Sequence, residues 1–355
     1  MSEQQFLVNR NDLSDTRWQE NANPPALAAG QVRLKVDQFA LTANNITYAV
    51  AGDSMNYWDF FPAAAGWGQV PVWGFADVIE SAHEGIAVGN RYYGYYPMAT
   101  HLTVQAERVS ERGFTDVVEH RAALAAVYNQ YLQVPARSAA EEAAEMLYRP
   151  LFMTSFMLDD YIASNDFFGA QAVILTSASS KTSLGLAALL AQRPEITVVG
   201  LTSPGNRAFV EGLGCYAEVH LYDDAAALDA TRASVIVDMA GNGTALAAVH
   251  NHLGDTLKQS ILVGATHWNA RAGAQTMAGP KPELFFAPSH IAARTKEWGP
   301  GGMEQRFGGA WQHFTNAVQD WIEVDARSGP EAITEVYRLQ LAGKAPANRG
   351  YVLGW

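Results

Sequence analysis

The chain has 355 residues, 48% hydrophobic and 17% charged, which is typical of a globular protein of about two domains. Its net charge of −12 argues against a general affinity for nucleic acid or anionic membranes. Cys215 is the single cysteine, which excludes an intrachain disulfide and a four-cysteine zinc site. No apolar run approaches the roughly 18 residues of a membrane span and no signal peptide is recognisable, so we expect a cytoplasmic protein.

The first part of the chain is predicted to be mostly β. Residues 31–41 alternate apolar and polar side chains, as a half-buried strand does. Further strand-like segments, separated by Gly and Pro, indicate a small barrel; they are 71–81, 89–98 and 101–109. Residues 119–147 are predicted to be helical with a break at Pro135. Ser138, three residues before Glu141, predicts a capping box at a helix start.

From about residue 150, apolar strands alternate with helices, which predicts a parallel sheet covered on both faces. The expected strands are 172–176, 196–202, 217–222, 233–241 and 260–266. The expected helices are 152–165, 182–193, 205–213 and 243–253. An amphipathic helix over 311–326 and a strand over 350–355 are expected near the C-terminus.

The stretch "AVILTSASSKTSLGLAALLAQ" has the outline of a strand, a turn and a helix that binds a phosphate at its N-terminus. The turn lacks the usual glycines, but small side chains leave room and hydroxyls and a lysine can bind phosphate oxygens. The predicted ligands are Ser177, Ser179, Ser180, Lys181 and Thr182. A P-loop is excluded because Leu175 and Ser180 stand where it needs glycine, and a Ser-x-x-Lys nucleophile because Ala178 replaces its serine. The alternative is a capped helix start that binds nothing.

The end of the second strand indicates which dinucleotide would bind. An NAD site has Asp or Glu there to bind the ribose 2′-OH, and this chain has none. Hydroxyls, an amide and a guanidinium suit a 2′-phosphate and predict NADP(H), with Thr202, Ser203, Asn206 and Arg207 as ligands. Gly264, after a later strand, is also assigned to the cofactor site. The alternative for Arg207 is a solvated arginine on a helix.

Several segments, in order, resemble the medium-chain dehydrogenase/reductases. They include "VPVWGFADVIES", "VGNRYYGYYP", the serine-rich turn and "ASVIVDMAGN". The resemblance is to the zinc-free quinone-oxidoreductase and enoyl-reductase side, in a divergent branch of unknown function. It implies an α/β fold with two domains. Residues 1–148 and 290–355 would form a GroES-like β-barrel domain with a helical insertion at about 111–147. Residues 149–289 would form a Rossmann domain, a doubly wound parallel sheet that binds NADP(H).

The resemblance also implies hydride transfer to a carbonyl or to a conjugated double bond, without zinc. Within "LTANNITYAV", part of a strand and loop at the substrate site, Asn44 and Asn45 would bind the substrate oxygen and Tyr48 would donate a proton. Alternatively, both asparagines hold a turn and Tyr48 belongs to the core. Aromatic residues crowd 55–68 and 91–97, where they either line a pocket for an apolar or planar substrate or serve as packing.

The sequence therefore favours an NADP(H)-dependent, zinc-independent reductase acting on a small carbonyl, enone or quinone-like substrate. Two alternatives stay open on the same fold: a non-redox enzyme such as a lyase or retro-aldolase, and a nucleotide-binding protein without catalysis. The expected partners are a small molecule and, by analogy with the family, a second copy of the chain paired through the edge of the nucleotide-domain sheet at "SILVGATHWN".

Overall fold

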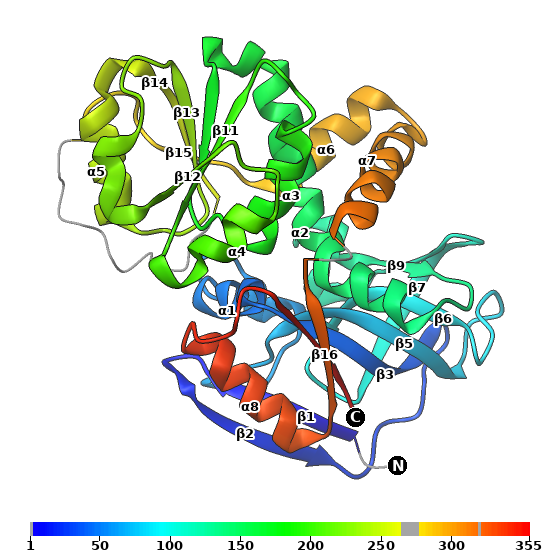
Figure 1. Ribbon diagram of the computed structural model, residues 1–355. Helices are drawn as coiled ribbons and strands as arrows, with labels where there is room; N and C mark the ends of the chain where they lie inside the picture. The colour runs from blue at the N-terminus through cyan, green and yellow to red at the C-terminus, as the bar shows by residue number, and fades with distance from the viewer. Residues whose placement is uncertain (1–2, 264–276, 319–320) are drawn as a thin grey trace. The chain divides into compact units, whose positions relative to one another are not determined.

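The computed structural model describes residues 3–263, 277–318 and 321–355, which form two compact units (Figure 1). Unit 1 comprises Met1–Leu147 and Glu323–Trp355, and unit 2 comprises Tyr148–Ile322. The chain returns to unit 1 later than the expected residue 290, because α7 (Gly302–Val318) packs in unit 2. Phe314 of α7 stacks on Phe152 of α2 (Ala139–Ser164), with ring centroids 4.4 Å apart. None of the described helices has the length and apolar character needed to cross a membrane.

Unit 1 contains a closed barrel of six strands, in which β3 pairs with both β5 and β7. The expected strands at 31–41 and 71–81 are confirmed. In sheet order the barrel strands are β3 (Gln31–Leu41), β5 (Pro71–Ser81), β6 (Arg91–Pro97), β9 (Gln130–Gln133), β8 (Gly113–Asp116) and β7 (His101–Ser110). The other elements are β1 (Glu3–Asn9), β2 (Asp12–Asn21), β4 (Trp67–Gly68), β16 (Glu323–Ser328), β17 (Arg349–Gly354), α1 (Ala43–Val50) and α8 (Pro330–Leu341).

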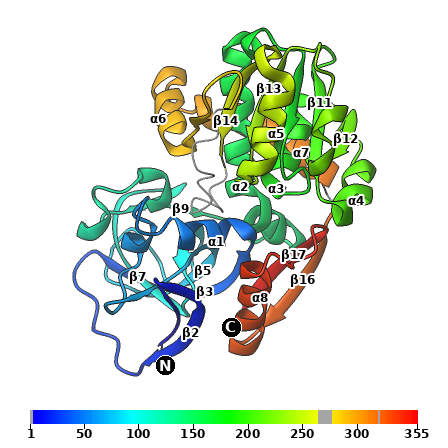
Figure 2. The same ribbon diagram turned by 90° about the vertical axis from the view of Figure 1, so that its left-hand side faces the viewer.

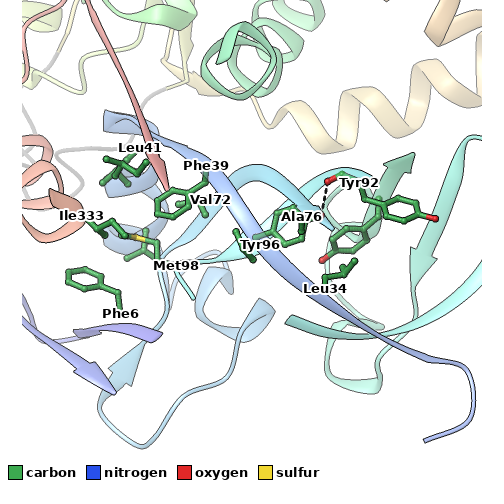
Figure 3. Close-up of a cluster of buried hydrophobic side chains, with 14 of the residues drawn as sticks. Phe6, Leu34, Phe39, Leu41, Val72, Ala76, Tyr92, Tyr96, Met98 and Ile333 are labelled. Atoms are coloured by element: carbon green, nitrogen blue, oxygen red, sulfur yellow. Dashed lines mark hydrogen bonds between the residues drawn. The ribbon is translucent and has the colours of Figure 1, made fainter. Parts of the chain in front are cut away.

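Side-chain alternation divides the aromatic residues of the barrel between its two faces. Tyr92 and Tyr96 of β6 belong to the barrel core with Val72 and Ala76 of β5, and the Tyr96 hydroxyl donates to the carbonyl of Tyr92 at 3.0 Å (Figure 3). Tyr93 and Tyr95, the alternate residues between them, point to the opposite face, where both rings lie against Trp73. The aromatic run in β6 therefore serves both the core and a second, outer cluster.

The expected helical insertion at 111–147 is wrong for most of its length. Residues 113–133 form β8, β9 and two short 3₁₀ helices, η2 (Glu119–Arg121) and η3 (Ala126–Asn129), and the long helix α2 starts only at Ala139. Tyr131 of β9 is fully buried and stacks on Phe114 at 5.0 Å. Burial of these rings in the barrel outweighs the helix propensity of the alanines. The capping box is confirmed, because Ser138 and Glu141 exchange hydrogen bonds.

Unit 2 is built on a six-stranded parallel sheet with helices on both faces (Figure 2). Its order is β12-β11-β10-β13-β14-β15, in which chain order reverses between β10 and β13, as in a Rossmann fold. The strands are β10 (Ala172–Leu175), β11 (Thr197–Thr202), β12 (Glu218–Leu221), β13 (Ser234–Asp238), β14 (Leu257–Leu262) and β15 (Glu283–Leu284). The helices besides α2 and α7 are α3 (Lys181–Leu190), α4 (Arg207–Gly212), α5 (Gly243–Leu253) and α6 (Ala287–Trp298).

Two expectations near the end of unit 2 need correction. The helix expected over 311–326 ends at Val318, and β16 begins at Glu323, because that strand pairs in parallel with β17 of unit 1. The strand expected over 260–266 is displaced to Leu257–Leu262, and residues 264–266 lie outside the described residues. Its outer neighbour in the sheet is β15, which pairs with Ile261 and Leu262.

Candidate cofactor and active site

The switch point of the unit 2 sheet is fixed by a buried hydrogen bond between its two central strands. The Thr176 hydroxyl, at the end of β10, donates to Asp238 at the end of β13 at 2.6 Å. The amide of Met239 donates to the same hydroxyl at 2.9 Å, so the loops after both strands are tied together. Ligands of open parallel sheets bind in the crevice at this position.

The serine-rich turn after β10 is held by side chains rather than by glycines. Ser177 adopts a left-handed conformation with φ 49°, which glycine more commonly takes. Its amide donates to the Tyr222 hydroxyl at 2.9 Å, and the Tyr216 hydroxyl donates to the carbonyl of Ala178 at 2.8 Å. Both tyrosines, which flank β12, were missed in the sequence, because no motif marks a distant side chain that supports a turn.

The start of α3 forms the other half of this turn. Ser180 caps the helix by accepting a hydrogen bond from the amide of Ser183. A Cβ on Gly185 would lie 2.7 Å from the Ser155 hydroxyl of α2, so this glycine permits close helix packing. The same Ser155 hydroxyl donates to the carbonyl of Thr182 at 2.7 Å. Burial lowers the pKa of Lys181, in the first turn of α3, to about 8.

Predicted ligands from two different loops meet beside this turn. The amide of Asn206, which follows β11, donates to the Ser179 hydroxyl at 3.1 Å. Thr202 is buried at the end of β11, and Ser203 begins the next 3₁₀ turn. Arg207 is half exposed and forms an ion pair with Glu211 at 2.8 Å; Asp224 also acts on it electrostatically. A 2′-phosphate would thus have to compete with two carboxylates for Arg207.

These residues suit the diphosphate of a dinucleotide. The turn offers hydroxyls, a lysine and the N-terminus of a ten-residue helix at the switch point of the sheet. In the described part of the chain, the amide of Ser179 donates to no other group, so it is available to an anion. Gly264, the remaining predicted ligand, lies outside the described residues.

In unit 1, the segment expected to be a loop after β3 is the helix α1. Thr42 caps it, and the Asn45 side chain accepts from the amide of Thr42 at 2.7 Å, which completes a capping box. The amide nitrogen of Asn45 donates to the carbonyl of Pro71 at 2.8 Å. Both ends of this buried amide are therefore used by the fold, and Asn45 does not retain its predicted role toward a substrate.

Tyr48 of α1 lies in an aromatic cluster on the outer face of the barrel. Trp73 of β5 and Tyr95 of β6 are directly opposite each other in the sheet, and α1 and two 3₁₀ helices cover them. We call Tyr48, Tyr57, Tyr95 and Tyr128 the phenol cluster. Tyr57 belongs to η1 (Tyr57–Phe60) and Tyr128 to η3. The rings of Tyr48 and Tyr57 are 4.6 Å apart, and those of Tyr95 and Tyr128 are 4.7 Å apart.

Polar contacts in this cluster converge on the Tyr48 oxygen. The indole nitrogen of Trp73 donates to it at 3.4 Å, and the polar side chains of Asn44 and Tyr128 also act to lower its pKa. Burial raises the pKa of Tyr48, because the phenolate would lose its hydration, whereas these three contacts favour the phenolate and limit the rise. Tyr48 is therefore a neutral phenol at physiological pH, beside groups that stabilise its ionised form. Trp73 and Tyr128 were not assigned from the sequence, whereas Tyr57 lies in the aromatic segment 55–68 noted there.

A cavity of about 190 Å³ also lies in unit 1. Its walls include Phe60 and Phe61, which border the aromatic cluster, and the buried pair of Arg121 and Asp116, whose atoms are 3.0 Å apart. None of the predicted site residues lines it.

Metal ligands were not expected. In the described ranges no three His, Cys, Asp or Glu side chains are grouped to hold an ion. Cys215 is buried in unit 2, where burial raises the pKa of its thiol to about 12.

Solved structures with a similar fold include proteins described as reductases. The chain matches a putative NADPH:quinone reductase from Mesorhizobium loti with a TM-score of 0.65 and 11% identity, covering 100% of this chain and 98% of that chain. It matches CurA from Vibrio vulnificus in complex with NADPH with a TM-score of 0.61 and 12% identity, covering 99% and 98%. It matches a mutant form of enoyl thioester reductase from Candida tropicalis with a TM-score of 0.59 and 11% identity, covering 100% of both. A search of curated protein sequences found no match.

A GroES-like barrel together with a Rossmann domain and these structural matches defines the fold of the medium-chain dehydrogenase/reductases, as the sequence resemblance predicted. Within this fold, a family described as a protein of unknown function (DUF2855) matches residues 39–346. The chain belongs to that family.

Proposed function

We propose that this protein is an NADP(H)-dependent, zinc-independent reductase acting on a small carbonyl, enone or quinone-like substrate. The observation that carries the proposal is the Tyr48 hydroxyl in the barrel domain, a neutral phenol whose oxygen accepts a hydrogen bond from Trp73 and has the polar side chains of Asn44 and Tyr128 as neighbours that favour the phenolate. The cofactor in this proposal follows from the polar turn at the switch point and from the similar fold of CurA, solved with NADPH.

In the proposal, the diphosphate of the cofactor is bound by the predicted ligands of the turn, namely Ser177, Ser179, Ser180, Lys181 and Thr182. The 2′-phosphate is bound by residues after β11, namely Thr202, Ser203, Asn206 and Arg207, and Gly264 remains a predicted ligand. When bound, the reduced cofactor would supply a hydride. No residue of the chain has to supply electrons, so the protein's part is binding, orientation and proton transfer.

The proton comes from Tyr48 in this proposal. Its O–H bond breaks as a new O–H or C–H bond forms on the substrate, and the electron pair stays on the Tyr48 oxygen. The donors around that oxygen stabilise the negative charge until water returns a proton. Asn44, partly exposed beside Tyr48, orients the substrate oxygen. The apolar rings around them favour a substrate with an apolar or planar part.

The test is oxidation of NADPH by the purified protein with a panel of enones, aldehydes and quinones. The proposal requires loss of NADPH absorbance with at least one acceptor and formation of the reduced product in equal amount. NADPH binding without any turnover would favour the non-catalytic alternative. Conversion of a substrate with no change in NADPH would favour the lyase alternative.

Two further parts of the proposal concern the setting of the enzyme. It would act in the cytoplasm, and it would form a homodimer through the edge of the unit 2 sheet, where β15 covers only the end of β14. Light scattering would test the second point, and a monomer at micromolar concentration would contradict it.

A further inference from the structure

We propose that Tyr222 is a positioning residue for the cofactor: its hydroxyl holds Ser177 in the left-handed conformation that shapes the turn between β10 and α3. Glycine adopts such a conformation without help, which is one reason why phosphate-binding turns use it. This inference rests on the proposed function, because it takes the turn to bind the diphosphate. It explains how a turn of serines replaces one of glycines.

The backbone of Ser177 has a conformation that a side chain disfavours. Its φ of 49° lies in the left-handed region, where the Cβ atom crowds the following carbonyl oxygen. Residues other than glycine keep this conformation only where the surrounding structure holds them in it. The turn from Ser177 to Ser183 contains no glycine, so neighbouring groups have to supply the restraint.

The peptide group that follows Ser177 is fixed by the backbone. The carbonyl of Ser177 accepts from the amide of Ser180 at 2.7 Å. The amide of Ala178 donates to the carbonyl of Leu201 in β11 at 3.0 Å. This side of the residue therefore needs no side chain to hold it.

The peptide group that precedes Ser177 is held by two side chains instead. Its carbonyl, from Thr176, accepts from the Ser183 hydroxyl at 2.9 Å. Its N–H, from Ser177, donates to the Tyr222 hydroxyl at 2.9 Å. Rotation of this peptide changes the φ of Ser177. Without the Tyr222 oxygen the amide has no partner in this conformation, so the peptide is free to rotate out of it.

The reach of Tyr222 follows from the order of the sheet. It comes directly after β12, which pairs with β11, and β11 pairs with β10. The three strands are parallel, so their carboxyl ends lie at the same edge, where the turn begins. The ring of Tyr222 is partly buried against the core of unit 2, which restrains the position of its hydroxyl.

A restrained turn favours binding because its donors are already in place. In the described part of the chain, the amide of Ser179 donates to no other group. A turn that kept its shape before the cofactor arrived would lose little freedom on binding, which increases affinity. Tyr222 thus acts on the cofactor through the shape of the turn rather than by touching it.

The experiment is a double-mutant cycle. Calorimetry measures the affinities for NADPH and NADH in the wild type, Tyr222→Phe, Ser177→Gly and the double variant. With serine at position 177, Tyr222→Phe should weaken both cofactors about 3- to 10-fold, the usual worth of one hydrogen bond. Ser177→Gly removes a predicted ligand hydroxyl and serves as a second background. In that background Tyr222→Phe should cost less than about 2-fold, because glycine needs no support at positive φ.

Tyr216→Phe is the matched control. It also removes a phenol oxygen beside β12 that contacts the turn, but this hydroxyl donates to the carbonyl of Ala178 at 2.8 Å and does not touch the peptide that precedes Ser177. Its effect on affinity should be the same with serine or glycine at position 177.

Amide hydrogen exchange of the wild type without cofactor, followed by NMR, tests the bond to Tyr222 without any substitution. The Ser177 amide should exchange more slowly than the unpartnered amide of Ser179.

Three results would overturn the role of Tyr222 and leave the proposed function intact. The first is a loss in Tyr222→Phe that is as large with glycine as with serine at position 177. The second is exchange of the Ser177 amide as fast as that of Ser179. The third is a loss confined to NADPH, which would indicate direct contact with the 2′-phosphate. Failure of the wild type to bind either cofactor would overturn both the inference and the proposed function.

Discussion

Arg207 forms an ion pair with Glu211, one helical turn further along α4, with 2.8 Å between the guanidinium and the carboxylate. If Arg207 binds a 2′-phosphate, the phosphate must share or replace this carboxylate. Arg207→Ala should therefore weaken NADPH about 10- to 100-fold and leave NADH nearly unchanged. Calorimetric titration with both cofactors measures the difference.

Glu211→Gln is the matched variant for the same interaction. It removes the competing charge and keeps a side chain of similar size, so NADPH should bind more tightly while NADH does not. Equal effects of Arg207→Ala on the two cofactors would remove Arg207 from the 2′-phosphate site.

Because the pKa of Lys181 is lowered, we expect cofactor binding to depend on pH. Burial lowers the pKa of this lysine to about 8, so its ammonium group is charged below that pH and loses its charge as the pH rises through it. NADPH affinity should accordingly fall between about pH 7 and pH 9. Lys181→Ala should weaken NADPH and NADH alike, since both share the diphosphate.

Lys181→Arg separates charge from other effects of alkaline pH. A guanidinium stays charged throughout this range, so the decline in affinity should flatten in this variant. An unchanged pH profile in Lys181→Arg would show that another group titrates.

Tyr48→Phe tests the proton donor. It keeps the ring and removes the hydroxyl, so kcat should fall by about 10²- to 10⁴-fold, the usual range for a general acid, while the NADPH dissociation constant stays the same. Unimpaired turnover would exclude Tyr48 from proton donation.

The two asparagines of α1 should respond differently to alanine. Asn45→Ala removes the capping box and the bond to Pro71, and should lower the free energy of unfolding by about 1–3 kcal/mol in a denaturant titration. Asn44→Ala should lower turnover with little loss of stability. The reverse pattern would show that Asn44 is the structural residue and Asn45 the one that meets substrate.

Thr176→Val tests the bond that ties the two central strands of unit 2. The isosteric change removes the donor to Asp238 and the acceptor of the Met239 amide, which leaves buried polar groups without partners. We expect the free energy of unfolding to fall by about 1–3 kcal/mol in a urea titration. A change within 0.3 kcal/mol of zero would contradict a stabilising role.

Much of the architecture is predictable from the sequence, because periodicity and turn chemistry are local. Alternation identified β3 and β5 with their observed bounds, and the apolar runs of unit 2 identified β10, β11, β12 and β13. The strand, turn and helix around residues 172–190 were recognised despite the serines of the turn, since the strand and helix keep their pattern; phosphate binding by the turn stays a prediction. The strands β1 and β2 were not predicted from the sequence, because most residues of β2 are polar and partly or fully exposed.

The candidate active site was only partly predictable. Tyr48 and Asn44 were assigned from one short motif, but their contacts come from residues far along the chain. Trp73 was not recognised as a site residue because it lies within a predicted strand. Tyr128 was not recognised because its segment has the composition of a helix. Asn45 was assigned to substrate, whereas the structure uses its amide to cap α1. Sequence spacing cannot show that these side chains meet, because the barrel brings them together.

The central claim is that the protein transfers a hydride from NADPH to a small substrate. The most direct measurement uses NADPH carrying two deuterium atoms at C4 of the nicotinamide with the best enone or aldehyde acceptor of the panel, because these acceptors gain a stable C–D bond, followed by mass spectrometry and NMR of the product. The account predicts one deuterium on the reduced carbon for each NADPH oxidised, in the wild type and, at a much lower rate, in Tyr48→Phe. A product without deuterium, or no binding of NADPH at millimolar concentration, would contradict it.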